Sequence, residues 1–189
     1  MNRFFAIILA SLILLGVGCC HHPITPPTLT PDPQTELRTA LATLANAHND
    51  KIKLAFWTST PLRPIDAPFK PFFTNMATQN KQLLTDLQTW AKQNKIDLTY
   101  RPPPGIAGDA EKIMNDRQEK LVRSDDKTAF QHHILIQMYI DYESNLSLCQ
   151  ALLPTLTDPA LKSYVEQTAH MYSIGSTEIL ALLARYKFQ

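Results

Sequence analysis

The sequence predicts an all-α protein, an antiparallel four-helix bundle. Only five of its 189 residues are Gly, and the 14 Pro gather mainly at 23–33, 61–71 and 102–104, leaving long proline-free segments between them. In these segments apolar residues recur at steps of three and four, which places them on one face of a helix. Since proline destabilises a helix interior by about 3 kcal/mol, the proline clusters mark the boundaries between helices.

Two long helices are expected in the first half of the chain. The first covers about 33–57, and its apolar stripe includes one histidine: Leu37, Leu41, Leu44, His48, Ile52 and Ala55. The second covers roughly 67–94, with an aromatic-rich stripe of Phe69, Phe72, Phe73, Met76, Asn80, Leu83, Leu87 and Trp90. Three prolines and a glycine at 102–105 separate it from the helices of the second half.

The second half predicts a short helix and two long ones. The short helix covers 109–122 and precedes the third long helix, which covers about 126–153 and has an N-cap in 124–127. The stripe of this third helix contains an acid: Phe130, Ile134, Met138, Asp141, Asn145, Leu148 and Leu152. The fourth long helix, to about residue 186, begins with Asp158 as N-cap and Pro159 at its first position.

The N-terminus has the layout of an export signal, with Arg3 before an apolar run from Phe4 to Val17. A cysteine after such a run resembles a bacterial lipoprotein signal, so residues 1–18 are interpreted as a signal peptide and Cys19 as the lipidated residue, with Cys20 as the alternative. A signal cleaved without lipidation also remains open. Residues 19–34 then form a Pro-rich tether and 35–187 the bundle domain.

These features predict a protein anchored in a bacterial cell-envelope membrane and facing the periplasm, with the outer membrane favoured over the inner. Removal of Arg3 with the signal leaves 17 basic and 17 acidic residues. No clustered basic face is evident, which excludes nucleic acid as the expected partner.

Three of the predicted helices resemble a known family. The stretches "FKPFFTNMATQNKQLLTDLQTWAKQNKIDL", "FQHHILIQMYIDYE" and "TDPALKSYVEQT" are similar to the second, third and fourth helices of the bacterial ferritin-like domain of unknown function 4142. This resemblance implies an exported ferritin-like bundle with no settled activity. The chain departs from the family pattern where polar ligands are expected: Gln79 and Asn80 replace Asp-His, Tyr142 replaces His, and Gly175 falls near an inward His.

The candidate site is a polar layer inside the bundle made of His48, Gln79, Asn80, Asp141 and Tyr142. A buried carboxylate is costly unless paired, so Asp141 is expected to find a partner among these groups. No cofactor is expected. The alternative is a divalent metal ion held by His48 and Asp141, although Glu-x-x-His, the motif of di-iron bundles, does not occur in the chain.

The protein is therefore expected to be a lipid-anchored bundle with a binding or scaffold role toward an unknown protein or small ligand. An interaction protein is favoured over an enzyme. No Ser-His-Asp arrangement, glycine-rich phosphate loop or CxxC pair supports a catalytic site. The alternative is a metal-binding or oxidative-stress protein with a reduced site around His48 and Asp141.

Overall fold

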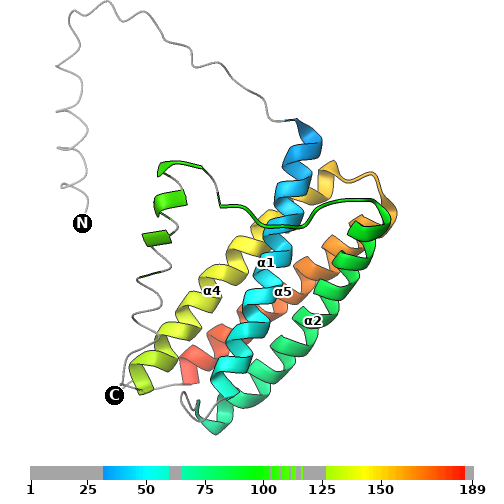
Figure 1. Cartoon of the computed structure of the whole chain (residues 1–189). Helices are drawn as coiled ribbons and strands as arrows, with labels where there is room; N and C mark the ends of the chain where they lie inside the picture. The colour runs from blue at the N-terminus through cyan, green and yellow to red at the C-terminus, as the bar shows by residue number, and fades with distance from the viewer. Residues whose placement is uncertain are drawn as a thin grey trace, which may run out of the picture. The chain divides into compact units, whose positions relative to one another are not determined.

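The protein folds as the predicted all-α bundle of four long helices (Figure 1). The computed structural model describes residues 32–59, 65–102 and 127–185, together with 104–106, 108–110, 112, 113 and 116. The helices are α1 (Pro33–Ser59), α2 (Lys70–Gln93), α4 (Lys127–Leu152) and α5 (Pro159–Arg185), with 3₁₀ turns η1 (Ala67–Phe69) and η2 (Leu153–Thr155). A short helix lies between α2 and α4, as expected, and includes residues 108–110.

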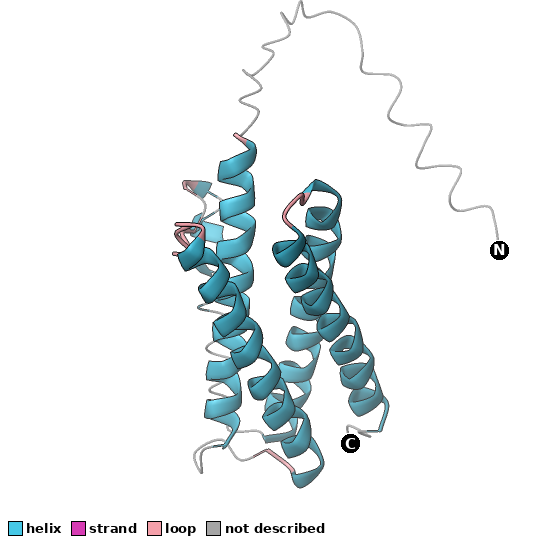
Figure 2. Ribbon diagram, turned by 90° about the vertical axis from the view of Figure 1, so that its right-hand side faces the viewer, coloured by secondary structure: helices cyan, strands magenta, loops and turns pink. Residues whose placement is uncertain are grey.

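The four helices form two antiparallel hairpins. α1 pairs with α2 and α4 pairs with α5, and contacts of α2 with α5 and of α1 with α4 join the hairpins (Figures 1 and 2). Packing is more extensive within each hairpin than across these two seams. Figure 1 shows α2 ending at the opposite end of the bundle from the start of α4, so the connection from 94 to 126 is a long crossover.

The side chain of Asp158 caps the start of α5 and links it to the end of α2. Asp158 Oδ1 accepts hydrogen bonds from the backbone N–H groups of Ala160 and Leu161, at 2.7 and 3.0 Å, which confirms the predicted N-cap. The other carboxylate oxygen of Asp158 accepts a hydrogen bond of 3.3 Å from Trp90 Nε1, so this cap also ties the end of α2 to the start of α5. The N-cap predicted in 124–127 falls largely outside the described residues.

The core follows the predicted stripes on α1 and α2, and on α4 five of the seven predicted positions form a buried line: Phe130, Ile134, Met138, Asn145 and Leu152. Leu135, Tyr142 and Cys149 are buried beside this line. Asp141 and Leu148, predicted on this line, are only half-buried at its edge. The acid is therefore not in the middle of the buried face.

The predicted signal segment, Cys19, Cys20 and the tether up to residue 31 lie outside the described residues, whereas α1 already begins at Pro33. No helix in the described part of the chain is both long and apolar enough to cross a membrane.

Candidate functional site

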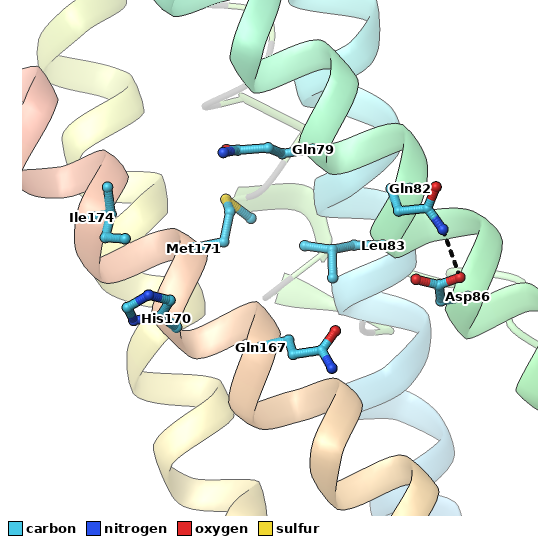
Figure 3. A pocket seen from close by; sticks show the side chains of 8 residues that line it. All are labelled: Gln79, Gln82, Leu83, Asp86, Gln167, His170, Met171 and Ile174. Atoms are coloured by element: carbon cyan, nitrogen blue, oxygen red, sulfur yellow. Dashed lines mark hydrogen bonds between the residues drawn. The ribbon is translucent and has the colours of Figure 1, made fainter.

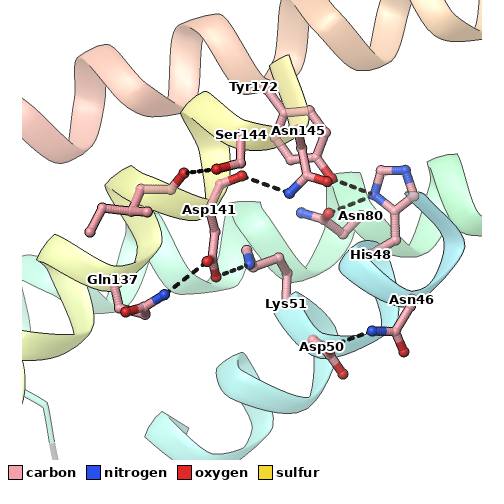
Figure 4. A network of polar contacts seen from close by, with 11 residues as sticks. Asn46, His48, Asp50, Lys51, Asn80, Gln137, Asp141, Ser144, Asn145 and Tyr172 are labelled. Atoms are coloured by element: carbon pink, nitrogen blue, oxygen red, sulfur yellow. Dashed lines mark hydrogen bonds and ion pairs between the residues drawn. The ribbon is translucent and has the colours of Figure 1, made fainter. Parts of the chain in front are cut away.

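His48, on α1, lies at the centre of a buried polar cluster and has no exposed surface. Its Nδ1 lies 2.8 Å from Asn80 Oδ1 on α2, and its Nε2 lies 2.9 Å from the hydroxyl of Tyr164 on α5 (Figure 4 draws the first contact). The amide nitrogen of Asn80 donates to the backbone carbonyl of Met76 at 2.8 Å, so Oδ1 is the atom that faces the imidazole. His48 Nδ1 therefore carries the proton, and Nε2 accepts the hydrogen bond from Tyr164.

Burial keeps this imidazole neutral. It lowers the pKa of His48 from 6.5 to about 4, helped by the nearby charge of Lys51 and opposed by the Asn80 hydrogen bond. At neutral pH His48 is thus a fixed, uncharged hydrogen-bonding group.

Three buried tyrosines complete the cluster. The Tyr172 ring stacks on His48 with centroids 5.9 Å apart and an interplanar angle of 3°, and its hydroxyl lies 3.5 Å from Nδ1. Tyr142 packs edge-on against Tyr172 at 5.1 Å. Burial raises the pKa of Tyr142, Tyr164 and Tyr172 well above its ordinary value, so all three remain protonated.

Gly175 on α5 is required by the ring of Tyr142. A Cβ atom at this position would lie 2.7 Å from Tyr142 Cδ1 and closer still to Cε1. Both residues depart from the family pattern, and the structure joins them in one contact. The tyrosine ring fills the space that a side chain on α5 would need.

Asp141 has a separate partner that sequence reasoning missed. Lys51 Nζ donates to Asp141 Oδ2 at 2.7 Å, and Gln137 Nε2 donates to Oδ1 at 3.0 Å (Figure 4). The side chain of Lys51 is 5% exposed and that of Asp141 36% exposed. Lys51 follows His48 by three residues and so lies on the same helix face, which was the available signal.

Gln79 lies outside the cluster. It is exposed and lines a groove of about 260 Å³ between α2 and α5, with Gln167, His170 and Met171 among its other residues (Figure 3). Of the five predicted residues, the structure thus brings together His48, Asn80 and Tyr142. It places Asp141 at an edge and Gln79 on the surface.

A divalent metal does not fit the His48 region as it stands. Both ring nitrogens of His48 are engaged by protein groups, and Asp141 bonds to Lys51 and Gln137 instead of facing the imidazole. Within the described residues, no three His, Cys, Asp or Glu side chains gather closely enough to hold a metal ion.

Comparison with protein-family models, with curated proteins and with solved structures found no match to this chain. Membership of the bacterial ferritin-like family therefore stays a prediction from the residues.

Proposed function

We propose that this protein is a non-catalytic helical bundle, anchored by a lipid at Cys19 in a bacterial cell-envelope membrane, with a binding or scaffold role toward an unknown protein or small ligand. The observation that carries the proposal is the closed centre of the bundle. His48 is neutral, and both its nitrogens are bonded to Asn80 and Tyr164. A general base or metal ligand needs a free lone pair directed at its substrate or ion, and here the Nε2 lone pair is occupied.

The packing around the cluster supports a structural role for it. The Tyr142 ring occupies the space beside Gly175, and Tyr142, Tyr164 and Tyr172 are all buried around the imidazole. A fully satisfied buried network of this kind rigidifies a core and specifies one arrangement of its helices. Recognition of a partner then falls to the surface of the bundle and to its seams.

The test of the non-metal assignment is the metal content of the full chain, purified without a His-tag after incubation with iron, manganese or zinc. We expect no stoichiometric metal, and we expect Asp141→Ala to leave the residual content unchanged. A stoichiometric metal that is lost in both Asp141→Ala and His48→Gln would overturn the proposal in favour of the metal-binding alternative.

The anchor is tested separately in a bacterial host by membrane fractionation and by incorporation of labelled fatty acid. We expect Cys19→Ser to abolish labelling and release the protein from the membrane fraction, whereas the matched variant Cys20→Ser stays labelled. Labelling that persists in Cys19→Ser and is lost in Cys20→Ser would move the acylation site by one residue. No labelling of the unaltered chain would refute the lipid anchor.

A further inference from the structure

The seam between α1 and α4 contains a cavity that the closed His48 cluster does not use. Its volume is about 150 Å³, and both helices contribute polar and apolar groups to it. α1 supplies Asp50, Lys51 and Leu54, and α4 supplies His133, Ile134, Gln137, Met138 and Asp141. A water molecule takes about 30 Å³ in the liquid, so the cavity has room for a small molecule of a few non-hydrogen atoms.

The charged groups of this cavity have both unused hydrogen-bond donors and unused hydrogen-bond acceptors. Lys51 is nine-tenths buried or more, yet its ammonium group makes one hydrogen bond, to Asp141. An ammonium group has three donors, so two remain. Each oxygen of Asp141 accepts one side-chain hydrogen bond, from Lys51 and from Gln137, and a carboxylate oxygen has room for a second.

His133 adds an orphaned atom on the same wall. Its Nε2 is buried and has no hydrogen-bond partner. A buried polar atom without a partner is uncommon in folded proteins, and a bound water or ligand is one way to satisfy it. His133, Gln137 and Asp141 follow one another at steps of four along α4, and all three line this cavity.

The balance of charge selects the class of ligand. Lys51 and Asp141 neutralise each other, and Asp50, the second carboxylate of the lining, is paired with Lys53 at 3.3 Å. A simple anion would therefore be repelled by Asp141 and a simple cation by Lys51. A zwitterion satisfies both, because its carboxylate can accept from the two free donors of Lys51 and from His133 while its ammonium group donates to the free acceptor sites of Asp141. Leu54, Ile134 and Met138 offer an apolar surface for a short side chain.

We propose that the α1–α4 seam is a binding site for a small zwitterionic amino acid with a short apolar side chain, held between Lys51, His133 and Asp141. This inference deepens the proposed binding role by naming a ligand class and rests on that role. Its failure is distinguishable, because neither the metal content of the chain nor its lipid labelling depends on this cavity.

The experiment compares three related probes on the purified full chain by calorimetric titration and by amide chemical-shift changes. L-valine carries both charges, isovalerate keeps only the carboxylate, and isobutylamine keeps only the amine. We expect L-valine to bind at least about tenfold more tightly than either half-ligand, since each half-ligand loses one set of charge-assisted hydrogen bonds. The largest shifts should fall on Leu54 and Met138.

Two variants and a control locate the site. Lys51→Met should weaken L-valine binding about tenfold or more, whereas Arg38→Met, which removes an exposed positive charge on the same helix away from the cavity, should not. If Lys51→Met fails to fold, the double variant Lys51→Met with Asp141→Leu replaces the ion pair by apolar groups and keeps the seam filled. Equal affinity for a half-ligand, no binding of L-valine, or unchanged binding in the folded double variant would each overturn the proposal.

Discussion

Replacing Gly175 by alanine tests how tightly the bundle is closed around Tyr142. The added Cβ would lie 2.7 Å from Tyr142 Cδ1, well inside the ordinary contact distance of 3.4–4 Å, and closer still to Cε1. The ring cannot retreat freely, because Tyr142 is 1% exposed and packs edge-on against Tyr172. Overpacking of this kind lowers the free energy of unfolding by about 1–3 kcal/mol, and so close an approach belongs at the upper end.

A second effect acts in the opposite direction. Alanine stabilises a helix interior by about 1 kcal/mol relative to glycine, so we expect a net loss of about 2 kcal/mol in Gly175→Ala. For a bundle of this size that corresponds to a fall in Tm of about 4–8 °C. Urea unfolding and thermal scans of the purified protein measure both quantities.

The matched control is Ser173→Ala, an exposed position on the same helix, where only the helix propensity changes and a gain of about 0.5 kcal/mol or less is expected. In a Tyr142→Leu background the clash is removed, so Gly175→Ala should there become stabilising by up to about 1 kcal/mol. A Gly175→Ala variant as stable as the unaltered protein would refute the argument, and so would an effect that does not change sign when the ring is removed.

Three further expectations concern the buried groups. The pKa of His48 is about 4 in the folded protein and 6.5 in the unfolded reference state. Between these pH values only the unfolded chain binds a proton on this imidazole, so protonation favours unfolding. The free energy of unfolding should therefore fall by roughly 3 kcal/mol as the pH drops from 6.5 to 4, and should level off above pH 6.5. Urea midpoints measured from pH 4 to 8 should depend less on pH in His48→Gln than in the unaltered protein. His170→Gln, which alters an exposed histidine, should keep the full pH dependence. Tyr164→Phe leaves His48 Nε2 without a donor and should lower the free energy of unfolding, measured by chemical denaturation, by about 1–3 kcal/mol. Tyr172→Phe should lower it less, because the Tyr172 hydroxyl is 3.5 Å from Nδ1. Equal losses in the two variants would contradict the hydrogen-bond assignment. Burial raises the pKa of the Cys149 thiol to about 12, so peptide mapping should find iodoacetamide on this residue after unfolding and not in the native protein.

The helices themselves could be predicted because their signals are local. Proline clusters follow the first and second long helices, and the three- and four-residue spacing identified most of the faces that are buried. The cap at Asp158 is equally local, since a carboxylate two residues before Ala160 can reach its backbone N–H without help from the rest of the fold. Each of these features depends on residues within one or two helical turns.

The candidate site was predicted less well because it depends on contacts between helices. Adjacent residues on a helix point about 100° apart, yet a wide apolar stripe can bury both members of a pair, as it does Phe72 and Phe73. In the pairs Gln79–Asn80 and Asp141–Tyr142 only the second residue is buried. Which member faces the core depends on how the helices are rotated against one another, and spacing within one helix does not determine that rotation.

Other contributors to the site could not be found from spacing alone. Tyr164 is 116 residues from His48 in the chain, and only the packing of the two hairpins against each other brings its hydroxyl to the imidazole. The burial of Lys51 likewise depends on Asp141, which lies 90 residues further along the chain. Partners at such separations are set by the assembled bundle rather than by any local pattern.

The single crossover has a consequence for how the molecule could be divided. A cut within it would leave two fragments, one with α1 and α2 and the other with α4 and α5, each keeping its own extensive helix pairing. The contacts that such fragments would have to restore include a few directional ones, among them His48 with Tyr164, Lys51 with Asp141 and Trp90 with Asp158. Apolar surfaces would draw almost any two such hairpins together, whereas these polar pairs distinguish the cognate half from an unrelated one. The chain thus consists of two helical hairpins that are complementary to each other through these polar pairs.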